Sequence, residues 1–577
     1  ANFGQICKRD FFCRSNRTTI FSNLQGNFKM KKGFSIIISR SDTEISSFIA
    51  EEYDSFYIKN QRFEFLFEGV LLNKNKLLQE FALKDFETLI QELYLIKKEQ
   101  IIPLFEGEYR GFIFDKIQNK LFVYTNITST QRVFYTSFED KIFIDTNLIR
   151  LNKTLRNSEI TTKPDVESIY QLLCFTNLPE DKTPIQNVKK LLDGNYLDID
   201  CSTLQWKELA YFNISETSAF SGDKNRAIDQ IHEIFTDSVL LEYEKDTELG
   251  TDHLALLSGG LDSRVAMMYA IKNNQKPGNA FCFSQSGYFD HTISEKIAHD
   301  FDIHYEFIPL NGGKFLNKID ELTQISEGMV FYTGGIHIQH ALDKMQYQNF
   351  ALFHSGQIGD GVLGGFNSEP KRKKPTYYKI VDNQKFFPKV QNSLDEILEK
   401  YETEELFMLR NVAYNRTILG AQVFQQQRYQ TSPFMTKDFL KFAISLPESW
   451  KFNHRFYIEW INKHCKEATQ YRWERTLMKP DANWKTSFGD KVMKRGFNLL
   501  NKKILQTPQN SSMYPYQYYF DNDLEIQRYY QKYFDDNIHR LEHYPELTQD
   551  VFTLFEANSF SLKSKAINIL SIFKLYF

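Results

Sequence analysis

The sequence predicts an α/β protein with two main parts, a layered α+β domain followed by a doubly wound parallel sheet with a helical C-terminal region. Three observations indicate this. The chain of 577 residues is too long for one hydrophobic core. Short β-like runs separated by helical stretches fill its first third. From residue 226 onward, strands alternate with helices, which is typical of a parallel sheet.

The first part runs from residue 30 to residue 212. Its clearest expected elements are a helix at Leu83–Lys98 and strands at Phe34–Ile38, Gly111–Phe114, Leu121–Tyr124 and Lys141–Asp145. Residues 1–29 are polar and contain no Met. We therefore expect a non-native or disordered extension there, with Met30 as the true start, and an ordinary disordered N-terminus as the alternative.

The second part follows a polar segment, residues 213–225, whose composition predicts a linker. Residues 226–490 then carry the alternating pattern, and residues 491–577 are expected to form a helical extension. The expected elements are helix Arg226–Tyr243, strand Leu254–Leu257, helix Leu261–Ile271, strand Ala280–Phe283, helix Thr292–Phe301, strand Tyr305–Leu310 and strand Phe350–Phe353. In such a sheet, ligands bind beyond the carboxyl ends of the strands.

The composition argues for a small-molecule substrate. Seventy basic and 73 acidic side chains leave a net charge of -3, which gives no overall attraction to nucleic acid or to an anionic membrane. The six cysteines show no CxxC or Cys/His clustering, which argues against a disulfide framework or a zinc site and fits a reducing compartment. No run approaches the roughly 18 apolar residues of a spanning helix, and the N-terminus lacks a signal-peptide core. We expect a cytoplasmic protein.

The string SGGLDSR, which directly follows the first strand of the second part, predicts a phosphate-binding turn. Gly259 and Gly260 let the backbone approach an anion at a helix N-terminus, and the hydroxyls of Ser258 and Ser263 are further donors. The string is neither a Walker loop nor GxGxxG. Asp262 would be repelled by phosphates unless a cation lay between them, so it is a candidate Mg²⁺ ligand. The alternative is an ordinary strand-to-helix turn.

The string also resembles the pyrophosphate-binding loop of the asparagine synthetase family of ATP pyrophosphatases, which cleave ATP between its α and β phosphates. A second string, SGQIGDGVLGGF at residues 355–366, is similar to the family's SGxGxDExxGGY loop. The resemblance makes Asp360 the second metal-binding carboxylate, unless Asp360 merely caps a surface turn. Two acidic positions of that loop are altered, to Gln357 and Gly361. Because the first is associated with positioning the substrate or the amine, the ordinary aspartate reaction is in doubt.

The resemblance implies ATP and Mg²⁺ as cofactors, with Asp262 and Asp360 as metal ligands and as catalytic residues. The nucleotide-binding residues that it implies are Leu257, Ser258, Gly259, Gly260, Leu261, Asp262, Ser263, Ser284 and Gly356. A late Lys-x-x-Phe element makes Lys485 the catalytic lysine, with Lys479 as its competitor. Arg264 stands where the family usually has Ser. It could pair with a substrate carboxylate or a phosphate, or lie exposed on its helix.

The N-terminal part resembles the family's glutaminase, a nucleophile-hydrolase-like αββα sandwich that begins Met-Cys-Gly. Here Lys32 stands where the nucleophilic Cys would be, and a lysine does not replace a thiolate. The string FEGVLLN at residues 67–73 is similar to NGEIYN, but the positions that grip glutamine are Glu68 and Val70. The resemblance thus implies a degenerate, inactive glutaminase domain. We expect its acidic residues to be ordinary surface charges.

The function implied is an amide-forming ligase that activates a small-molecule or peptide carboxylate as an acyl-adenylate, which ammonia or an amine then attacks. A natural-product cyclase, of the β-lactam synthetase or lasso-peptide cyclase type, and a sugar-acid amidating enzyme are alternatives. A tRNA-modifying ATP pyrophosphatase is disfavoured because the sequence lacks a catalytic cysteine pair and a basic face. A non-catalytic ATP-binding protein stays open, as does a homodimer.

Overall fold

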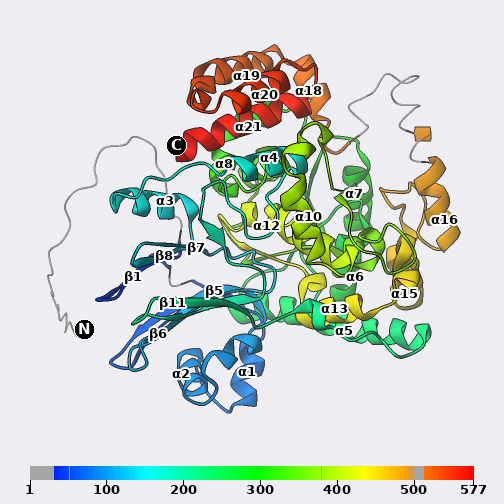
Figure 1. Cartoon of the computed structure of the whole chain (residues 1–577). Helices are drawn as coiled ribbons and strands as arrows, with labels where there is room; N and C mark the ends of the chain where they lie inside the picture. The colour runs from blue at the N-terminus through cyan, green and yellow to red at the C-terminus, as the bar shows by residue number, and fades with distance from the viewer. Residues whose placement is uncertain (1–31, 51, 378–379, 494–495, 498–511) are drawn as a thin grey trace, which may run out of the picture.

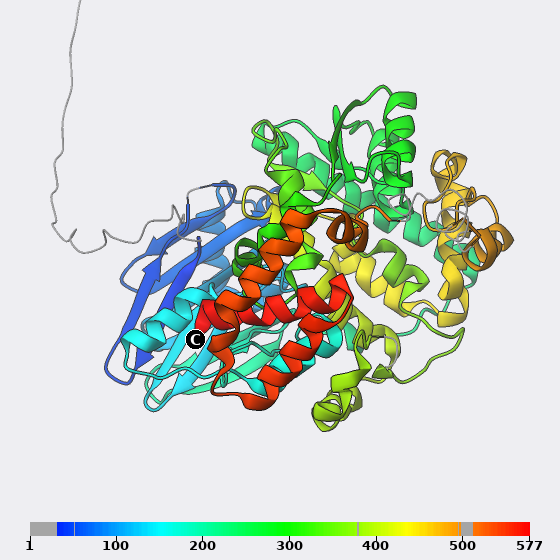
Figure 2. The ribbon, with the colours of Figure 1, turned by 90° about the horizontal axis from the view of Figure 1, so that it is seen from above.

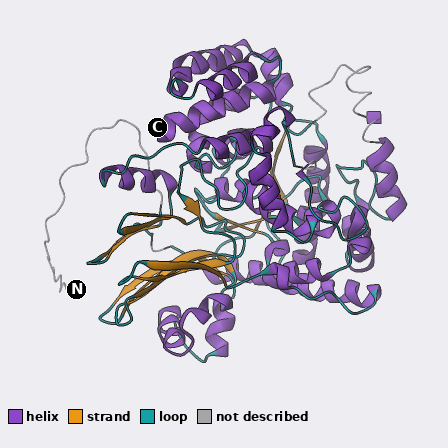
Figure 3. Cartoon of the chain, viewed as in Figure 1, coloured by secondary structure: helices purple, strands orange, loops and turns teal. Residues whose placement is uncertain are grey.

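The computed structural model describes residues 32–50, 52–377, 380–493, 496–497 and 512–577 (Figure 1). The expectations about residues 1–29 and about Met30 as the start lie outside these ranges. The predicted α/β class is confirmed, because the described chain combines two antiparallel sheets in its first part with a parallel sheet in its second. Figure 3 shows the strands gathered in these sheets and the helices around them.

The first part has four layers, with two antiparallel sheets stacked between helices (Figure 1). One sheet has the order β2-β1-β8-β7-β9 and the other β11-β10-β6-β5-β4-β3. The strands are β1 Phe34–Ser39, β2 Thr43–Ser47, β3 Phe56–Lys59, β4 Phe63–Leu71, β5 Gly107–Asp115, β6 Lys120–Thr125, β7 Phe134–Phe138, β8 Lys141–Asp145, β9 Lys189–Lys190, β10 Asn195–Asp200 and β11 Gln205–Ala210. The helices are α1 Lys74–Glu80 and α2 Phe86–Lys97 beside the second sheet, and α3 Leu148–Asn157 and α4 Val166–Phe175 beside the first.

Burial along the strands explains the layers. In β1 buried residues alternate with partly buried ones, because only one face packs against the other sheet. Every residue of β4 is buried, because one of its faces packs into the core between the sheets and the other against α2. Leu66 belongs to the first of these cores, and Phe65 and Phe67 belong to the second.

The expectation that the acidic residues of the first part are surface charges is wrong for several of them. Glu68, Glu108, Asp115 and Asp145 are buried. Their burial is compensated by partners. Glu68 accepts a hydrogen bond of 2.7 Å from Arg110 Nε. Asp145 forms an ion pair of 2.6 Å with Arg150. The pair of Glu68 with Arg110 joins segments 42 residues apart in sequence, so the charge pattern alone does not reveal it.

The second part is built on a five-stranded parallel sheet of order β14-β13-β12-β15-β16. The strands are β12 Leu254–Leu256, β13 Asn279–Ser284, β14 His304–Pro309, β15 Leu352–His354 and β16 Tyr429–Thr431. The chain moves from β12 to one side through β13 and β14 and then returns to the other side through β15 and β16. The order therefore switches direction between β12 and β15, where doubly wound folds bind their ligands. Only β16 is missing from the sequence prediction.

Helices cover both faces of this sheet (Figure 1). The α-helices of the second part are α5 Lys224–Leu249, α6 Leu261–Lys272, α7 Phe289–Asp300, α8 Ile319–Ser326, α9 Ile336–Leu342, α10 Gln391–Glu399, α11 Glu404–Met408, α12 Leu419–Phe424, α13 Lys437–Ser445, α14 Glu448–Lys451, α15 Arg455–His464 and α16 Asn483–Phe488. No helix in the described ranges is long and apolar enough to cross a bilayer.

Four C-terminal helices form the layer drawn in orange and red in Figures 1 and 2. They are α18 Tyr516–Asn522, α19 Leu524–Asn537, α20 Pro545–Glu556 and α21 Phe560–Tyr576. Most of α21 is buried, and Asn152 on α3 donates a hydrogen bond of 3.2 Å to the carbonyl of Tyr576. One hydrophobic core runs through helices of all three regions. The C-terminal helices are thus integrated with both sheet-bearing parts.

Candidate functional site

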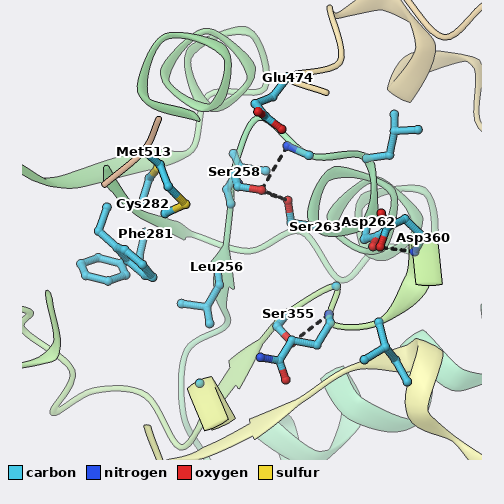
Figure 4. A pocket seen from close by; sticks show the side chains of 18 of the residues that line it. Leu256, Ser258, Asp262, Ser263, Phe281, Cys282, Ser355, Asp360, Glu474 and Met513 are labelled. Atoms are coloured by element: carbon cyan, nitrogen blue, oxygen red, sulfur yellow. Dashed lines mark hydrogen bonds between the residues drawn. The ribbon is translucent and has the colours of Figure 1, made fainter. Parts of the chain in front are cut away.

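A cavity of about 670 Å³ opens at the carboxyl ends of β12, β13 and β15 (Figure 4). It lies at the switch point of the parallel sheet, where the fold leads one to expect a ligand. Seven of the nine predicted nucleotide-binding residues line it, namely Leu257, Ser258, Gly260, Leu261, Asp262, Ser263 and Gly356. Gly259 and Ser284 do not. The amide of Gly259 turns away to donate 2.9 Å to Asp290, and the fully buried Ser284 hydroxyl donates to the carbonyl of Gln285.

The turn between β12 and α6 is held by its own hydroxyl groups. The Ser263 hydroxyl accepts from the amide of Ser258, and the Ser258 hydroxyl accepts from the amide of Gly260, each at 3.1 Å. The two hydroxyls also lie 3.1 Å apart, as the dashed lines of Figure 4 show. Gly260 caps α6, so the first turn of a twelve-residue helix faces the cavity with its positive end. This is a pre-formed cradle for an anion.

Asp262 and Asp360, which are 98 residues apart in sequence, meet beside this cradle. The backbone amide of Asp360 donates 2.8 Å to Asp262 Oδ2, and the Tyr457 hydroxyl donates 2.9 Å to Oδ1. Figure 4 shows both carboxylates on one side of the turn. The second loop can approach so closely because it has glycines. A Cβ at Gly356 would lie 2.3 Å from the carbonyl carbon of Asp262, and one at Gly359 would lie 2.7 Å from its carboxyl carbon.

The electrostatics of this pair favour a cation. Burial, followed by the charge of Asp360, raises the pKa of Asp262 well above its usual range. Burial also raises the pKa of Asp360, whereas Arg475 opposes that rise. The Asp360 side chain is still 47% exposed, so its oxygens remain open to the cavity. Two carboxylates beside a phosphate cradle are the donor set that Mg²⁺ prefers.

One wall of the cavity comes from a segment that the sequence interpretation missed. Trp473, Glu474 and Arg475 line it, after α15. The amide of Glu474 donates 3.1 Å to the carbonyl of Gly259, which fixes the wall to the phosphate turn. Arg475 Nη1 lies 3.6 Å from Asp360 Oδ2, and Arg475 is the one cation among the described lining residues. No family string marks this segment, so only the three-dimensional structure reveals it.

The structure does not bring Lys485 to this site. Lys485 lies on α16, pairs with Asp481 at 2.8 Å and is not among the cavity-lining residues. Lys479 is exposed and is not among them either. The cation beside the carboxylates is therefore Arg475.

Neither expectation for Arg264 is correct. Its side chain is fully buried, and its guanidinium donates to five backbone carbonyls instead of a ligand. Two of these carbonyls belong to Gly259 and Gly260, and the other three to Ala468, Tyr471 and Arg472. Burial lowers the pKa of Arg264 to about 10, so it stays charged at neutral pH. Arg264 thus connects the turn at Gly259 and Gly260 to residues 468–472, which precede the cavity wall formed by Trp473, Glu474 and Arg475.

The turn divides the rest of the cavity into two halves. On one side lie apolar groups, with Phe281, Cys282 and the C-terminal Met513 opposite the two aspartates in Figure 4. The remaining lining combines amide side chains with apolar ones, among them Gln357, Gln430, Ile338 and Phe424. An oxygen of each of the two glutamines is buried without a hydrogen-bond partner among the described residues. Such orphaned polar atoms are typical of a binding site.

A comparison with known protein families finds a match in the part of the chain that carries the turn and Asp360. Residues 230–426 match the family described as asparagine synthase. This segment is therefore similar to an asparagine synthase domain, and the match supports a ligase-type enzyme. The segment includes the phosphate turn and Asp360 but ends before β16, so Tyr457, Arg475 and Met513 lie outside it.

Searches of whole proteins add little to the asparagine synthase match. No curated protein matches the chain. Among solved structures, one titled "structure of the allosteric regulatory enzyme of purine biosynthesis" is 8% identical, with 37% of this chain and 52% of that chain covered and a TM-score of 0.21. A B. subtilis glutamine phosphoribosylpyrophosphate amidotransferase with ADP and GMP is 9% identical, with coverage of 48% and 59% and a TM-score of 0.21. This chain thus spans less than two thirds of either, and likenesses this weak carry no conclusion about it.

Proposed function

We propose that this protein activates a substrate carboxylate with ATP as an acyl-adenylate and then transfers the acyl group to ammonia or an amine. One observation carries the proposal. The backbone amide of Asp360 donates a hydrogen bond of 2.8 Å to the Asp262 carboxylate, which brings the two acidic residues together at the edge of the cradle. An ATP pyrophosphatase needs such a pair, because cleavage between the α and β phosphates requires charge neutralisation on the leaving pyrophosphate.

Each part of the cavity has a role in this reaction. The amides of the turn and the start of α6 would hold the phosphates. Asp262 and Asp360 would hold Mg²⁺, which when bound neutralises phosphate charge. Tyr457 fixes the orientation of Asp262 through its hydrogen bond of 2.9 Å. The apolar side with Phe281 and Met513 suits the base.

We assign to Arg475, in place of Lys485, the role of stabilising the negative charge that develops at the α-phosphate. The substrate carboxylate attacks the α-phosphorus, the bond to the bridging oxygen breaks, and pyrophosphate leaves with the electron pair. A guanidinium beside Asp360 can donate to the oxygens that gain charge in this step. The amine then attacks the acyl carbon and AMP leaves.

The nitrogen would come from ammonia or an amine and not from glutamine. By the resemblance, Lys32 stands where the family has its nucleophilic cysteine, and its side chain pairs with Glu52. The four cysteines among the described residues are buried, and burial raises the pKa of each thiol, that of Cys201 to about 11. A thiol with a raised pKa supplies little thiolate near neutral pH. These features support an inactive glutaminase half.

The test is exchange of ³²P-labelled pyrophosphate into ATP with Mg²⁺ and a panel of carboxylates that includes aspartate. Exchange that depends on one carboxylate is expected, followed by AMP release on addition of ammonia or an amine and not of glutamine. ATP binding without exchange for any carboxylate of a broad panel would instead favour a non-catalytic ATP-binding protein. AMP release driven by glutamine would contradict the inactive glutaminase half.

A further inference from the structure

A second cluster of side chains of the kinds that bind metal ions lies outside the residues that line the cavity. Asp246 near the end of α5, His253 just before β12 and His354 at the end of β15 each offer a ligand atom, and these atoms all lie within 4.8 Å of one another. His253 Nδ1 is 3.0 Å and His354 Nε2 is 2.6 Å from the same oxygen, Asp246 Oδ2. Strand β12, which follows α5, leads into the turn at residues 258–263, and β15 leads into the loop at residues 355–366.

The surroundings of the cluster are those of a built site. Asp246 and His354 are buried, whereas the His253 side chain is 16% exposed and leaves a route from solvent. The second ring nitrogen of His354, Nδ1, lies 3.3 Å from the Thr431 hydroxyl. The ring also stacks on Tyr243 with centroids 3.9 Å apart. These contacts fix the ring so that Nε2 faces Asp246.

A buried carboxylate beside the cluster has an oxygen without a hydrogen bond. Glu242 is 1% exposed, and its Oε2 accepts no hydrogen bond from any described residue but lies 3.6 Å from His354 Nδ1. Metal-binding histidines commonly have a carboxylate at their second nitrogen, which orients the ring and makes the ligand more basic. Glu242 occupies that place.

Charge balance points the same way. Asp246 and Glu242 place two buried carboxylates beside the two imidazoles, and buried carboxylates are costly unless a cation pairs with them. A divalent cation would balance their charge. A proton on His354 is the competing solution, since burial opposes a charge on this ring but Asp246 and Glu242 together raise its pKa to about 9.

From these contacts we propose that Asp246, His253 and His354 bind a transition-metal dication of the Zn²⁺ class, with Glu242 as the carboxylate that orients His354. Imidazole nitrogen and carboxylate oxygen are zinc ligands at about 2.0–2.1 Å. Ligand atoms on a tetrahedral ion of that size lie about 3.3 Å apart, so the present spacing needs to open by less than about 1 Å. A solvent molecule on the exposed side would complete four ligands.

The site is distinct from the proposed Mg²⁺ pair in chemistry and position. Asp262 and Asp360 offer oxygen only and line the cavity, whereas this cluster offers two nitrogens and none of its three residues lines that cavity. A metal here would tie α5 to both central strands and hold the two cavity loops in place. This role does not depend on the proposed reaction.

The experiment uses the full chain, treated with a chelator and dialysed, and titrated with Co²⁺ and then Zn²⁺. One Co²⁺ per chain should bind with visible d–d absorption, Zn²⁺ should displace it, and Zn²⁺ should raise the Tm. His253→Gln should weaken binding at least about 100-fold, and Glu242→Gln by about 10–100-fold. Absence of any Co²⁺ spectrum together with an unchanged Tm would overturn the proposal.

Three variants keep the test specific. His304→Gln, on an exposed histidine of β14, should bind Zn²⁺ like the wild type. Asp360→Asn should also bind Zn²⁺ like the wild type. Loss of Zn²⁺ binding in Asp360→Asn would assign the metal to the ATP site and refute the proposal. Because His354 is fully buried, the partly exposed His253 is the main variant, with circular dichroism to confirm its fold. Wild-type affinity in folded His253→Gln would equally refute the site.

Discussion

Two polar cavities differ in how their charges are balanced. In the cavity of about 290 Å³ between the N-terminal part and the second part, three of the four lining cations pair with a carboxylate, namely Lys32, Arg110 and Arg132. The fourth, Arg428, donates to backbone carbonyls. In the cavity that we propose as the ATP site, Asp262 and Asp360 lie together with Arg475 as the one cation among the described lining residues. Paired charges stabilise an interface, whereas two adjacent carboxylates require a further cation. The comparison thus separates a cavity held by structural ion pairs from the cavity that we propose as the site of the reaction.

The largest expected effect is that of Asp262→Asn. The loss of one ligand charge should reduce pyrophosphate exchange by at least about 10³-fold and leave the fold intact. The matched change in the other cavity, Glu68→Gln, should leave exchange unchanged and lower only the Tm. Exchange rates and thermal melts of both variants check this. Unchanged turnover in Asp262→Asn would sink the assignment of the site.

The interface is expected to respond in stability instead. Arg132 donates to Ser326 and to the carboxylate of Glu327, and it also contacts Gln422, all in the second part. Arg132→Met leaves Glu327 without its cation, so the free energy of unfolding should fall by about 3 kcal/mol. The exposed Arg372, which pairs with Glu402, is the control, and Arg372→Met should cost at most about 0.5 kcal/mol. Urea denaturation gives both values, and equal losses would show that the interface pair has no special role.

The choice between Arg475 and Lys485 has a smaller but decisive effect. Arg475→Ala should lower kcat for pyrophosphate exchange by about 10²-fold, because it removes the cation beside Asp360. Lys485→Ala should change kcat by less than about twofold, since Lys485 pairs with Asp481 outside the cavity. A large loss for Lys485→Ala with little change for Arg475→Ala would restore the assignment that the sequence suggests.

The smallest expected effect is a pH dependence at Glu108. Burial raises the pKa of this carboxyl to about 8, so the folded state keeps a proton that the unfolded chain loses near pH 4.5. The contribution of Glu108 to stability should therefore fall as the pH rises from about 4.5 to 8. Glu108→Gln, which mimics the protonated form, should gain on the order of 1–2 kcal/mol over the wild type between pH 6 and pH 8. Parallel stability curves from urea denaturation would contradict this.

The sequence predicts the features that are contiguous in the chain. The string SGGLDS lies at the end of β12 as expected, and Asp360 follows β15 and meets Asp262. The alternation of strands and helices predicts the parallel sheet because each element carries its own hydrophobic pattern. Even there, β16 is missed, since three residues are too few for a periodic signal.

Features that depend on distant contacts are not predictable in this way. Tyr457 contacts Asp262, and Arg475 and Met513 line the cavity, all from segments with no recognisable string. Arg264 is buried because carbonyls of residues 468–472 surround its guanidinium. The cluster of Asp246 with two histidines is likewise dispersed, so the spacing rules for metal sites do not detect it. Single residues brought together by packing leave no local pattern in a sequence.

The claim that Asp262 and Asp360 together hold a metal ion can be tested directly, without knowledge of the carboxylate substrate. Mn²⁺ replaces Mg²⁺, and electron paramagnetic resonance measures its binding in the presence of an α,β-methylene analogue of ATP. The wild type should bind the Mn²⁺–nucleotide complex, and both Asp262→Asn and Asp360→Asn should bind it at least about 10-fold more weakly, while Glu68→Gln binds it normally. Wild-type affinity in both aspartate variants would contradict the claim that these two carboxylates hold the metal of the ATP site.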